Sequence, residues 1–380
     1  MTARPEDVPD REDSRQPPQS ASRREFLTGR AARREMEQAA GQLADELPSA
    51  AAPQAPEGRE TVRLATRAMA CDFSVILNPG HGEELPAASE ALDLVHVLED
   101  QLTVYRPHSE MSLLNTHAAE APVVVEEKLF RLLVEAAEIS RQTEGAFDPT
   151  SGPLIALWRE CRQAARLPAQ AEIDRCLART GLEHVQFDAA ARTVHYLREG
   201  VELNLGGIGK GYALDRAAHL LDDGQVSSWL MHGGHSSLLA RGQHTGASGW
   251  PVGIRNPLFP DRQLATIVLE NQAMASSGSG TQHFRLEGKR YGHILDPRNG
   301  WPVEGMLSVA VLAPTAALAD ALSTAFFVLG LEKARQWCDN REDVAALLIP
   351  PPRRGQTLQP VVCGIPEDRL FFAEGVTPAE

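Results

Sequence analysis

Apolar positions with strand-like or helix-like spacing begin near residue 61 and continue to the late 340s. Residues 61–68 and 72–77 have the composition of strands, and the turn-forming sequence Asn78-Pro79-Gly80 follows the second of them. Apolar residues recur with a 3.6-residue period over 84–104 and 125–143, which predicts two amphipathic helices.

The same criteria predict the elements of the rest of the chain. Shorter helices are expected over 153–165 and 171–180, and strands 184–187 and 193–197 are expected to form a hairpin. The remaining predicted elements are strands over 201–205, 226–231, 236–240, 251–254, 264–269, 307–312 and 344–349, with helices over 212–221 and 315–330. Because hairpins and helices are grouped separately, the pattern predicts an α+β fold with mixed, largely antiparallel sheets packed against helices.

The first 58 residues differ from the rest of the chain. They are rich in Pro, Ala, Glu, Arg and Gln and hold few large apolar side chains, which predicts a disordered or docking segment ahead of one domain over residues 59–376. The sequence Ser22-Arg23-Arg24-Glu25-Phe26-Leu27 resembles a twin-arginine export motif, but the polar residues 28–38 stand where an export signal needs an apolar stretch. We therefore expect a cytoplasmic protein, with export as the alternative.

Composition narrows the classes of partner. The chain has 380 residues and a formal net charge of −14, which disfavours binding to nucleic acid, because phosphate contacts need clustered Lys and Arg. No stretch approaches the roughly 20 apolar residues of a membrane span. The five cysteines are scattered and lack C-x-x-C spacing, so they indicate reduced core thiols.

One carboxylate stands out in the apolar helix predicted over 315–330. Asp320 is the only acid in this segment, and a buried charge needs a cation or strong hydrogen-bond donors. Thr324 follows one turn later on the same face, so its hydroxyl and the carboxylate can converge on a hard cation such as Mg²⁺. The alternative is structural, with Thr324 bonding back to the Asp320 carbonyl and Asp320 capping or pairing.

A glycine cluster, Asn204-Leu205-Gly206-Gly207-Ile208-Gly209-Lys210-Gly211, lies between a predicted strand and a predicted helix. Backbone N–H groups at such a junction can hold an anion, although glycine-rich turns often reflect tight packing alone. The cluster departs from both the Walker and the Rossmann fingerprints. Lys210 favours a bound anion, because a cation at a helix entrance opposes the helix dipole.

Several motifs, taken in order, resemble those of the ApbE family of FAD:protein FMN transferases. They are Met69-Ala70-Cys71, Tyr105-Arg106-Pro107 with Ser109-Glu110 and Asn115, Gly145-Ala146-Phe147-Asp148-Pro149-Thr150, the glycine cluster through Asp215, Gly233-Gly234, Ser277-Gly278, Tyr291-Gly292-His293-Ile294-Leu295-Asp296-Pro297 with Gly300, and Asp320-Ala321-Leu322-Ser323-Thr324. The resemblance covers residue 62 to the late 340s and implies an ApbE-like fold.

The resemblance also implies an activity: cleavage of FAD with Mg²⁺ and transfer of FMN to a Thr or Ser hydroxyl of an acceptor protein, with release of AMP. The implied acceptor is a membrane-associated redox protein. By motif position, the metal would be held by Asp320, Thr324 and the backbone carbonyl of Gly207. The residues implied to contact FAD are Met69, Tyr105, Ala146, Phe147, Asp148, Asn204, Lys210, His293 and Ile294.

Alternatives remain for individual residues. His293 is the candidate base for the acceptor hydroxyl, because the unperturbed pKa of histidine is near neutral, and the alternative is a structural histidine before a turn. Tyr105 and Phe147 can be ordinary core residues, and Asp148 can be a turn residue.

Three departures from the family pattern remove potential negative charges: Asn204, His235 and Ser279 stand where an acid is common, Asn also being found at the last. They keep two other functions open, namely hydrolysis of FAD to FMN and AMP, and binding of flavin without catalysis.

Overall fold

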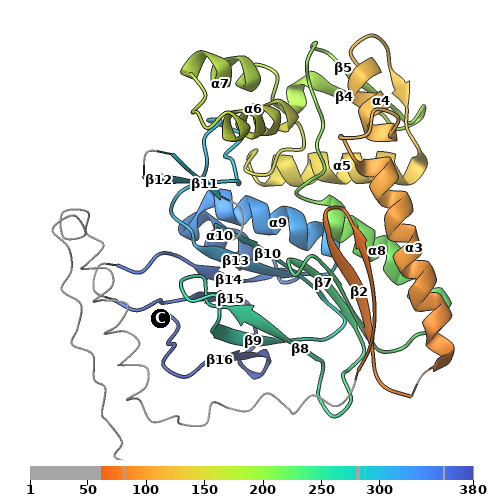
Figure 1. Cartoon of the computed structure of the whole chain (residues 1–380), viewed down its shortest axis with the longest axis vertical. Helices are drawn as coiled ribbons and strands as arrows, with labels where there is room; N and C mark the ends of the chain where they lie inside the picture. Colours follow the sequence, from red (N-terminus) through yellow and green to blue (C-terminus); the bar gives the residue numbers. More distant parts are fainter. Residues whose placement is uncertain (1–60, 81, 280–282, 287, 354–355, 380) are drawn as a thin grey trace, which may run out of the picture. The chain divides into compact units, whose positions relative to one another are not determined.

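The computed structural model describes residues 61–379 except 81, 280–282, 287 and 354–355 (Figure 1). The predicted N-terminal segment over 1–58, with its twin-arginine-like motif, lies outside the described residues. The proposed start of the domain at residue 59 stays a prediction for the same reason.

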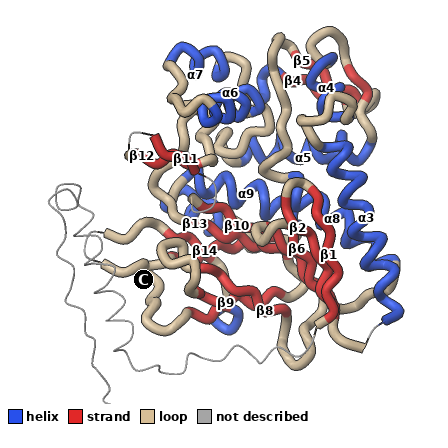
Figure 2. The backbone as a smooth tube through the Cα atoms, in the orientation of Figure 1, coloured by secondary structure: helices blue, strands red, loops and turns tan. Residues whose placement is uncertain are grey.

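An eight-stranded sheet forms the centre of the fold (Figures 1 and 2). Its strands, in spatial order, are β1 (Val62–Ala68), β2 (Cys71–Leu77), β6 (Trp229–Gly233), β7 (Ser237–Arg241), β10 (Ala273–Gly278), β13 (Ser308–Ala313), β14 (Ala345–Ile349) and β15 (Val361–Cys363). Each neighbouring pair is antiparallel. The predicted α+β class with largely antiparallel sheets is confirmed.

Helices cover one face of this sheet and a smaller sheet covers the other. The covering helices are α3 (Leu85–Leu102), α8 (Gly209–Asp223), α9 (Ala316–Leu329) and α10 (Leu331–Asp339). On the opposite face, β8 (Trp250–Arg255), β9 (Gln263–Leu269) and β16 (Leu370–Phe372) form a three-stranded sheet with its own apolar cluster. Side chains of successive residues in the central strands therefore pack into two different hydrophobic cores. Met231 packs on the helical side and Leu230 on the side of the smaller sheet.

The remaining elements lie beyond α8 and α9 in Figure 1. They are α4 (Glu110–His117), α5 (Glu127–Gln142), α6 (Gly152–Gln163), α7 (Gln170–Leu177), the small sheet of β3 (Val123–Val124), β5 (Thr193–Tyr196) and β4 (Val185–Asp188), and the hairpin of β11 (His283–Leu286) and β12 (Lys289–Gly292).

Two predicted elements are wrong in detail. Residues 201–205 do not form a strand, because the Asn115 side chain takes the backbone bonds of Leu203, donating to its carbonyl at 2.9 Å and accepting from its N–H at 2.9 Å. The helix expected from residue 212 begins at Gly209, so two glycines of the cluster are helical. The strands β3, β10–β12, β15 and β16 and the helices α4 and α10 were not predicted.

None of the helices in the described part of the chain combines the length and the apolar character that crossing a bilayer requires.

Candidate functional site

Part of the predicted site lies at one end of the central sheet. The β1–β2 turn, the β6–β7 turn and the last residues of β10 all lie at this end, as the pairings Ala68 with Cys71 and Gly233 with Ser237 show. The turns are linked, because the N–H of Gly234 donates to the Asp72 carbonyl at 2.9 Å. The entrance of α8 and the middle of α9 meet them through Asp320.

The β1–β2 turn is a strained two-residue connection. Met69 and Ala70 have φ values of 50° and 59°, as a type I′ turn requires, although such turns normally use Asn, Asp or Gly. Left-handed backbone at two successive non-glycine residues costs free energy, and such strain clusters at functional sites. The turn places Met69, an expected FAD contact, half-buried at the margin of the core.

Asp320 is buried and has the donors that its charge requires. The residue is 4% exposed, and its carboxylate accepts from the Gly211 N–H at 2.7 Å and from the Ser237 hydroxyl at 2.5 Å. The Lys210 ammonium lies 3.8 Å from Oδ2. The expectation that this acid would meet a cation or strong donors is confirmed, and both are present.

The glycine cluster contributes the entrance of α8. Lys210 lies in the first helical turn, so its ammonium opposes the helix dipole and is balanced by Asp320. Gly211 is needed for close packing: a Cβ there would lie 2.0 Å from the Ala316 carbonyl oxygen. Tight packing therefore explains Gly211, whose N–H also donates to the Asp320 carboxylate.

Thr324 and Gly207 lie beside each other, as the metal assignment requires. A Cβ on Gly207 would be 3.6 Å from Thr324 Oγ1 and 3.2 Å from the Phe147 ring. The bond back to the Asp320 carbonyl comes from Ser323, at 2.9 Å, and the Thr324 hydroxyl makes no hydrogen bond within the described residues. Its oxygen is therefore available to a cation together with the Asp320 carboxylate.

These oxygens fit a hard divalent cation. Carboxylate, hydroxyl and backbone carbonyl are oxygen ligands of the kind that Mg²⁺ prefers. Across the described part of the chain, no group of three or more His, Cys, Asp or Glu side chains forms a rival metal site. Of the three proposed ligands, only the Asp320 carboxylate would bring a negative charge to the cation.

The F-D-P-T segment forms a wall of the site. Ala146 and Phe147 are buried, and Phe147 packs in the core beside Gly207. Asp148 acts as a turn residue: its Oδ1 accepts from the Thr150 N–H at 2.8 Å and from the Thr150 hydroxyl at 2.6 Å. Burial raises the pKa of the Asp148 carboxyl despite these bonds.

Asn204 is attached to the same wall. Its N–H donates to the Pro149 carbonyl at 2.7 Å, and its side-chain oxygen accepts from the Gly206 N–H at 2.8 Å. Asn204 therefore shapes the start of the glycine cluster and joins it to the F-D-P-T segment.

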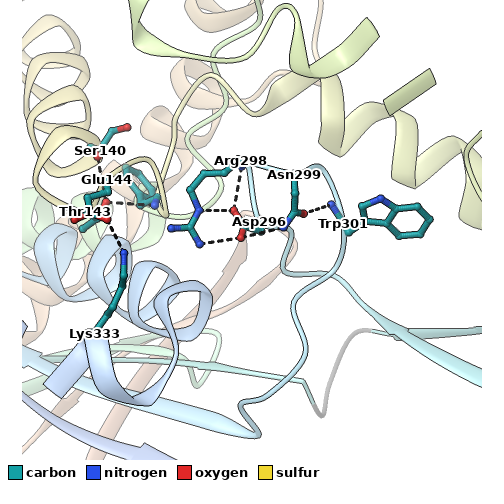
Figure 3. Close-up of polar contacts among 9 residues, drawn as sticks. Ser140, Thr143, Glu144, Asp296, Arg298, Asn299, Trp301 and Lys333 are labelled. Atoms are coloured by element: carbon teal, nitrogen blue, oxygen red, sulfur yellow. Dashed lines mark hydrogen bonds and ion pairs between the residues drawn. The ribbon is translucent and has the colours of Figure 1, made fainter. Parts of the chain in front are cut away.

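The turn that ends the H-I-L-D-P segment lies near the turn at Glu144, as Asp296 and Arg298 show in Figure 3. Asp296 organises it by accepting from the Arg298 side chain at 2.8 Å and from the Arg298 N–H at 3.0 Å. A Cβ on Gly145 would be 3.8 Å from Arg298 Cγ. His293 is exposed directly after β12, and Ile294 is buried beneath it.

Tyr105 is exposed rather than part of the core. Its side chain is 66% exposed, and the Arg159 guanidinium of α6 lies 4.9 Å from the centre of its ring. An exposed aromatic ring under a cation is available to stack on a ligand. The core-packing alternative is wrong for Tyr105 and correct for Phe147.

Two features of the site were not predicted. Ser237 bonds to Asp320, and the hydroxyls of Ser277 and Ser323 lie 2.9 Å apart beside it. His235 stacks on buried His232 with ring centres 5.3 Å apart. Burial lowers the pKa of His232 to about 4. No sequence motif marks Ser237 or His232, and it is the packing of β7 against α9 that brings Ser237 to Asp320.

Comparison with known proteins identifies the family of this chain. A model of the ApbE family matches residues 69–348. A relative from Klebsiella pneumoniae, an FAD:protein FMN transferase, is 34% identical over 273 residues, which are 71% of this chain and 83% of the relative. A protein of the same name from Escherichia coli K12 is 33% identical over 258 residues, covering 66% of this chain and 73% of the relative.

Solved structures show the same fold. The ApbE protein of Thermotoga maritima has a TM-score of 0.72 at 29% identity, covering 79% of this chain and 96% of that one. The flavin transferase ApbE of Vibrio cholerae has a TM-score of 0.70 at 27% identity, covering 80% and 97%. The motifs, the fold and the shared sequence lead to one conclusion: this chain belongs to the ApbE family.

Proposed function

We propose that this protein transfers FMN from FAD to a Thr or Ser hydroxyl of an acceptor protein, with Mg²⁺ at Asp320 and with release of AMP. The observation that carries the proposal is the buried Asp320 carboxylate at the entrance of α8, with Thr324 one helical turn further along α9 and beside Gly207. The relatives described above are named FAD:protein FMN transferase, which supports transfer of FMN from FAD to a protein. A membrane-associated redox protein is the acceptor that we propose.

The chain's own residues supply binding and orientation. The Lys210 ammonium at the entrance of α8 suits phosphate oxygens. Tyr105 offers a flat surface for a ring of FAD, while Phe147 closes the site behind Gly207. When bound, Mg²⁺ neutralises the charge that develops on the pyrophosphate during cleavage.

His293 is the residue that we propose as the base. Its exposed position after β12 leaves it accessible to an acceptor hydroxyl, and a neutral imidazole can take the hydroxyl proton at near-neutral pH. The neighbouring Asp296 turn fixes the backbone that follows it.

Product analysis tests the proposal. The protein is incubated with FAD, Mg²⁺ and an acceptor protein, and the acceptor is examined by mass spectrometry for an FMN-sized increment while AMP is measured in solution. Asp320→Asn, which keeps the shape of the side chain, should lower adduct formation by about a hundredfold or more, as expected for a preorganised charge. Asp343→Asn, at an exposed ion pair with Arg341, is the matched control.

Two outcomes would overturn the transferase assignment. FMN and AMP released without any adduct indicate hydrolysis of FAD, with water in place of the acceptor. Tight FAD binding without AMP release indicates a flavin-binding protein.

A further inference from the structure

The Lys210–Asp320 contact has the features of an exchangeable ion pair. Lys210 Nζ lies 3.8 Å from Asp320 Oδ2, beyond hydrogen-bond distance, whereas the Gly211 N–H is at 2.7 Å from the same oxygen. The carboxylate is thus fixed by the backbone and by Ser237, while the ammonium is held by charge alone.

We propose that Lys210 is a displaceable counter-ion of Asp320, which the phosphates of the dinucleotide draw away so that a divalent cation can share the carboxylate. This inference rests on the proposed function and adds an order of events to it: the metal binds strongly only together with the nucleotide.

The two residues differ in exposure. The Asp320 side chain is 5% exposed and sits on a helix within the core, whereas the Lys210 side chain is 26% exposed at a helix entrance. No second acidic partner of Lys210 exists among the residues that the structure describes. A flexible four-carbon stem allows the ammonium to swing to a nearby phosphate without movement of the backbone.

Charge explains why exchange is required. A divalent cation on Asp320 and an ammonium within 4 Å of the same carboxylate repel each other strongly in a site with little water. Two phosphate groups offer Lys210 an alternative partner and offer the metal further oxygen ligands. Nucleotide and metal should therefore increase each other's affinity, because the coupling between two sites is reciprocal.

The test measures Mn²⁺ binding, by electron paramagnetic resonance, to the full-length protein at pH 8 with and without FAD. Mn²⁺ is the probe because it accepts the same oxygen ligands as Mg²⁺. AMP is followed in parallel so that cleaved FAD is not counted as bound substrate. For the wild-type protein we expect FAD to raise the Mn²⁺ affinity about tenfold or more, as in typical site coupling.

Lys210→Met should raise the Mn²⁺ affinity of the nucleotide-free protein about tenfold. It should also reduce the further gain from FAD, because no ammonium is left for the phosphates to draw away from Asp320. Lys210→Arg keeps the charge and should behave like the wild type. Lys333→Met removes a surface lysine paired with Glu144 and is the matched control. Lys210→Gln, together with thermal unfolding of every variant, guards against a loss of folding.

The outcomes separate two failures. If FAD raises Mn²⁺ affinity but Lys210→Met and Lys210→Gln leave the nucleotide-free affinity unchanged or lower, the exchange is overturned and the metal site stands. If the wild type binds no Mn²⁺ even with FAD, the metal assignment fails and the exchange fails with it.

Discussion

Asp215 and Asp320 lie on two crossing helices, and each carboxylate accepts hydrogen bonds from the N-terminal turn of the other helix. Asp215 of α8 accepts from the N–H groups of Ala316 and Ala317 at 2.8 Å each. Asp320 of α9 accepts from the N–H of Gly211 at 2.7 Å. Both helix dipoles therefore face a negative charge, and a single crossing both stabilises the fold and positions the acid of the site.

The first prediction concerns the pH dependence at Asp215. Burial raises the pKa of its carboxyl to about 6, from 3.8. Because the folded value is the higher one, protonation favours the folded state, and the contribution of Asp215 to the free energy of unfolding falls as pH rises from 4 to 6. Relative to that of Asp215→Asn, the free energy of unfolding of the wild type should fall by up to about 3 kcal/mol over this range.

Urea unfolding of both proteins from pH 4.5 to 7.5 measures this difference. Asp93→Asn, an exposed change on α3, serves as the control and should leave the difference from the wild type flat with pH. A flat difference for Asp215→Asn would show that the carboxyl is not penalised by burial.

The second prediction concerns the helix crossing. Gly211→Ala would place a Cβ 2.0 Å from the Ala316 carbonyl oxygen and 2.6 Å from the Ala317 nitrogen, where backbone cannot yield cheaply. We expect the free energy of unfolding to fall by about 3 kcal/mol or more. Gly82→Ala meets nothing within 4 Å and should change it by less than about 0.5 kcal/mol. Equal stability of the two variants in urea unfolding would contradict the close approach.

Thr324 provides a test that separates activity from stability. Thr324→Val keeps the shape but removes the hydroxyl, which makes no hydrogen bond within the described residues, so unfolding should change little. FMN transfer should fall by about tenfold to a hundredfold, as is typical for altered metal sites. Thr324→Ser keeps the oxygen and should retain most of the activity. A valine variant with unaltered kcat and Mg²⁺ dependence would remove Thr324 from the metal site.

The fourth prediction concerns His232. Its pKa is lowered to about 4 from 6.5, chiefly because it is buried. As the pH falls, this histidine is therefore protonated at a higher pH in the unfolded chain than in the folded protein. Its contribution is complete above pH 6.5 and is lost as pH falls towards 4, by up to about 3 kcal/mol. His232→Gln preserves a partner for the Ser74 hydroxyl and should lose less stability over this range than the wild type. His96→Gln, at an exposed histidine, should follow the wild type in thermal unfolding across these pH values.

The sequence predicted the strongly patterned elements and missed those without pattern. The strand β10 reads Ala-Met-Ala-Ser-Ser-Gly and lacks the β-branched and aromatic residues that mark strands, although it lies in the middle of the sheet. Small residues suit this position because α9 packs directly against it. Residues 201–205 show the reverse case: their pattern suggested a strand, but Asn115 takes the ladder bonds.

The sequence predicted the acid at the centre of the site but not the residues that donate hydrogen bonds to it. An acid in an apolar helix is visible in sequence, and so is its need for donors. That the donors are Ser237 and Gly211 depends on which strand and which helix lie beside α9, and no local pattern states this. The motif resemblance identified Asp148 but could not show that it holds Thr150.

The contact at Gly211 limits how this enzyme can respond to what it binds. A backbone atom of α9 lies where a side chain on Gly211 of α8 would be, so the two helices cannot move closer together at this contact. Adaptation to a large dinucleotide is then left to side chains such as Lys210 and Tyr105 and to the connecting loops. Efforts to change which donor is bound should therefore begin with those side chains and loops and leave the contact between α8 and α9 unchanged.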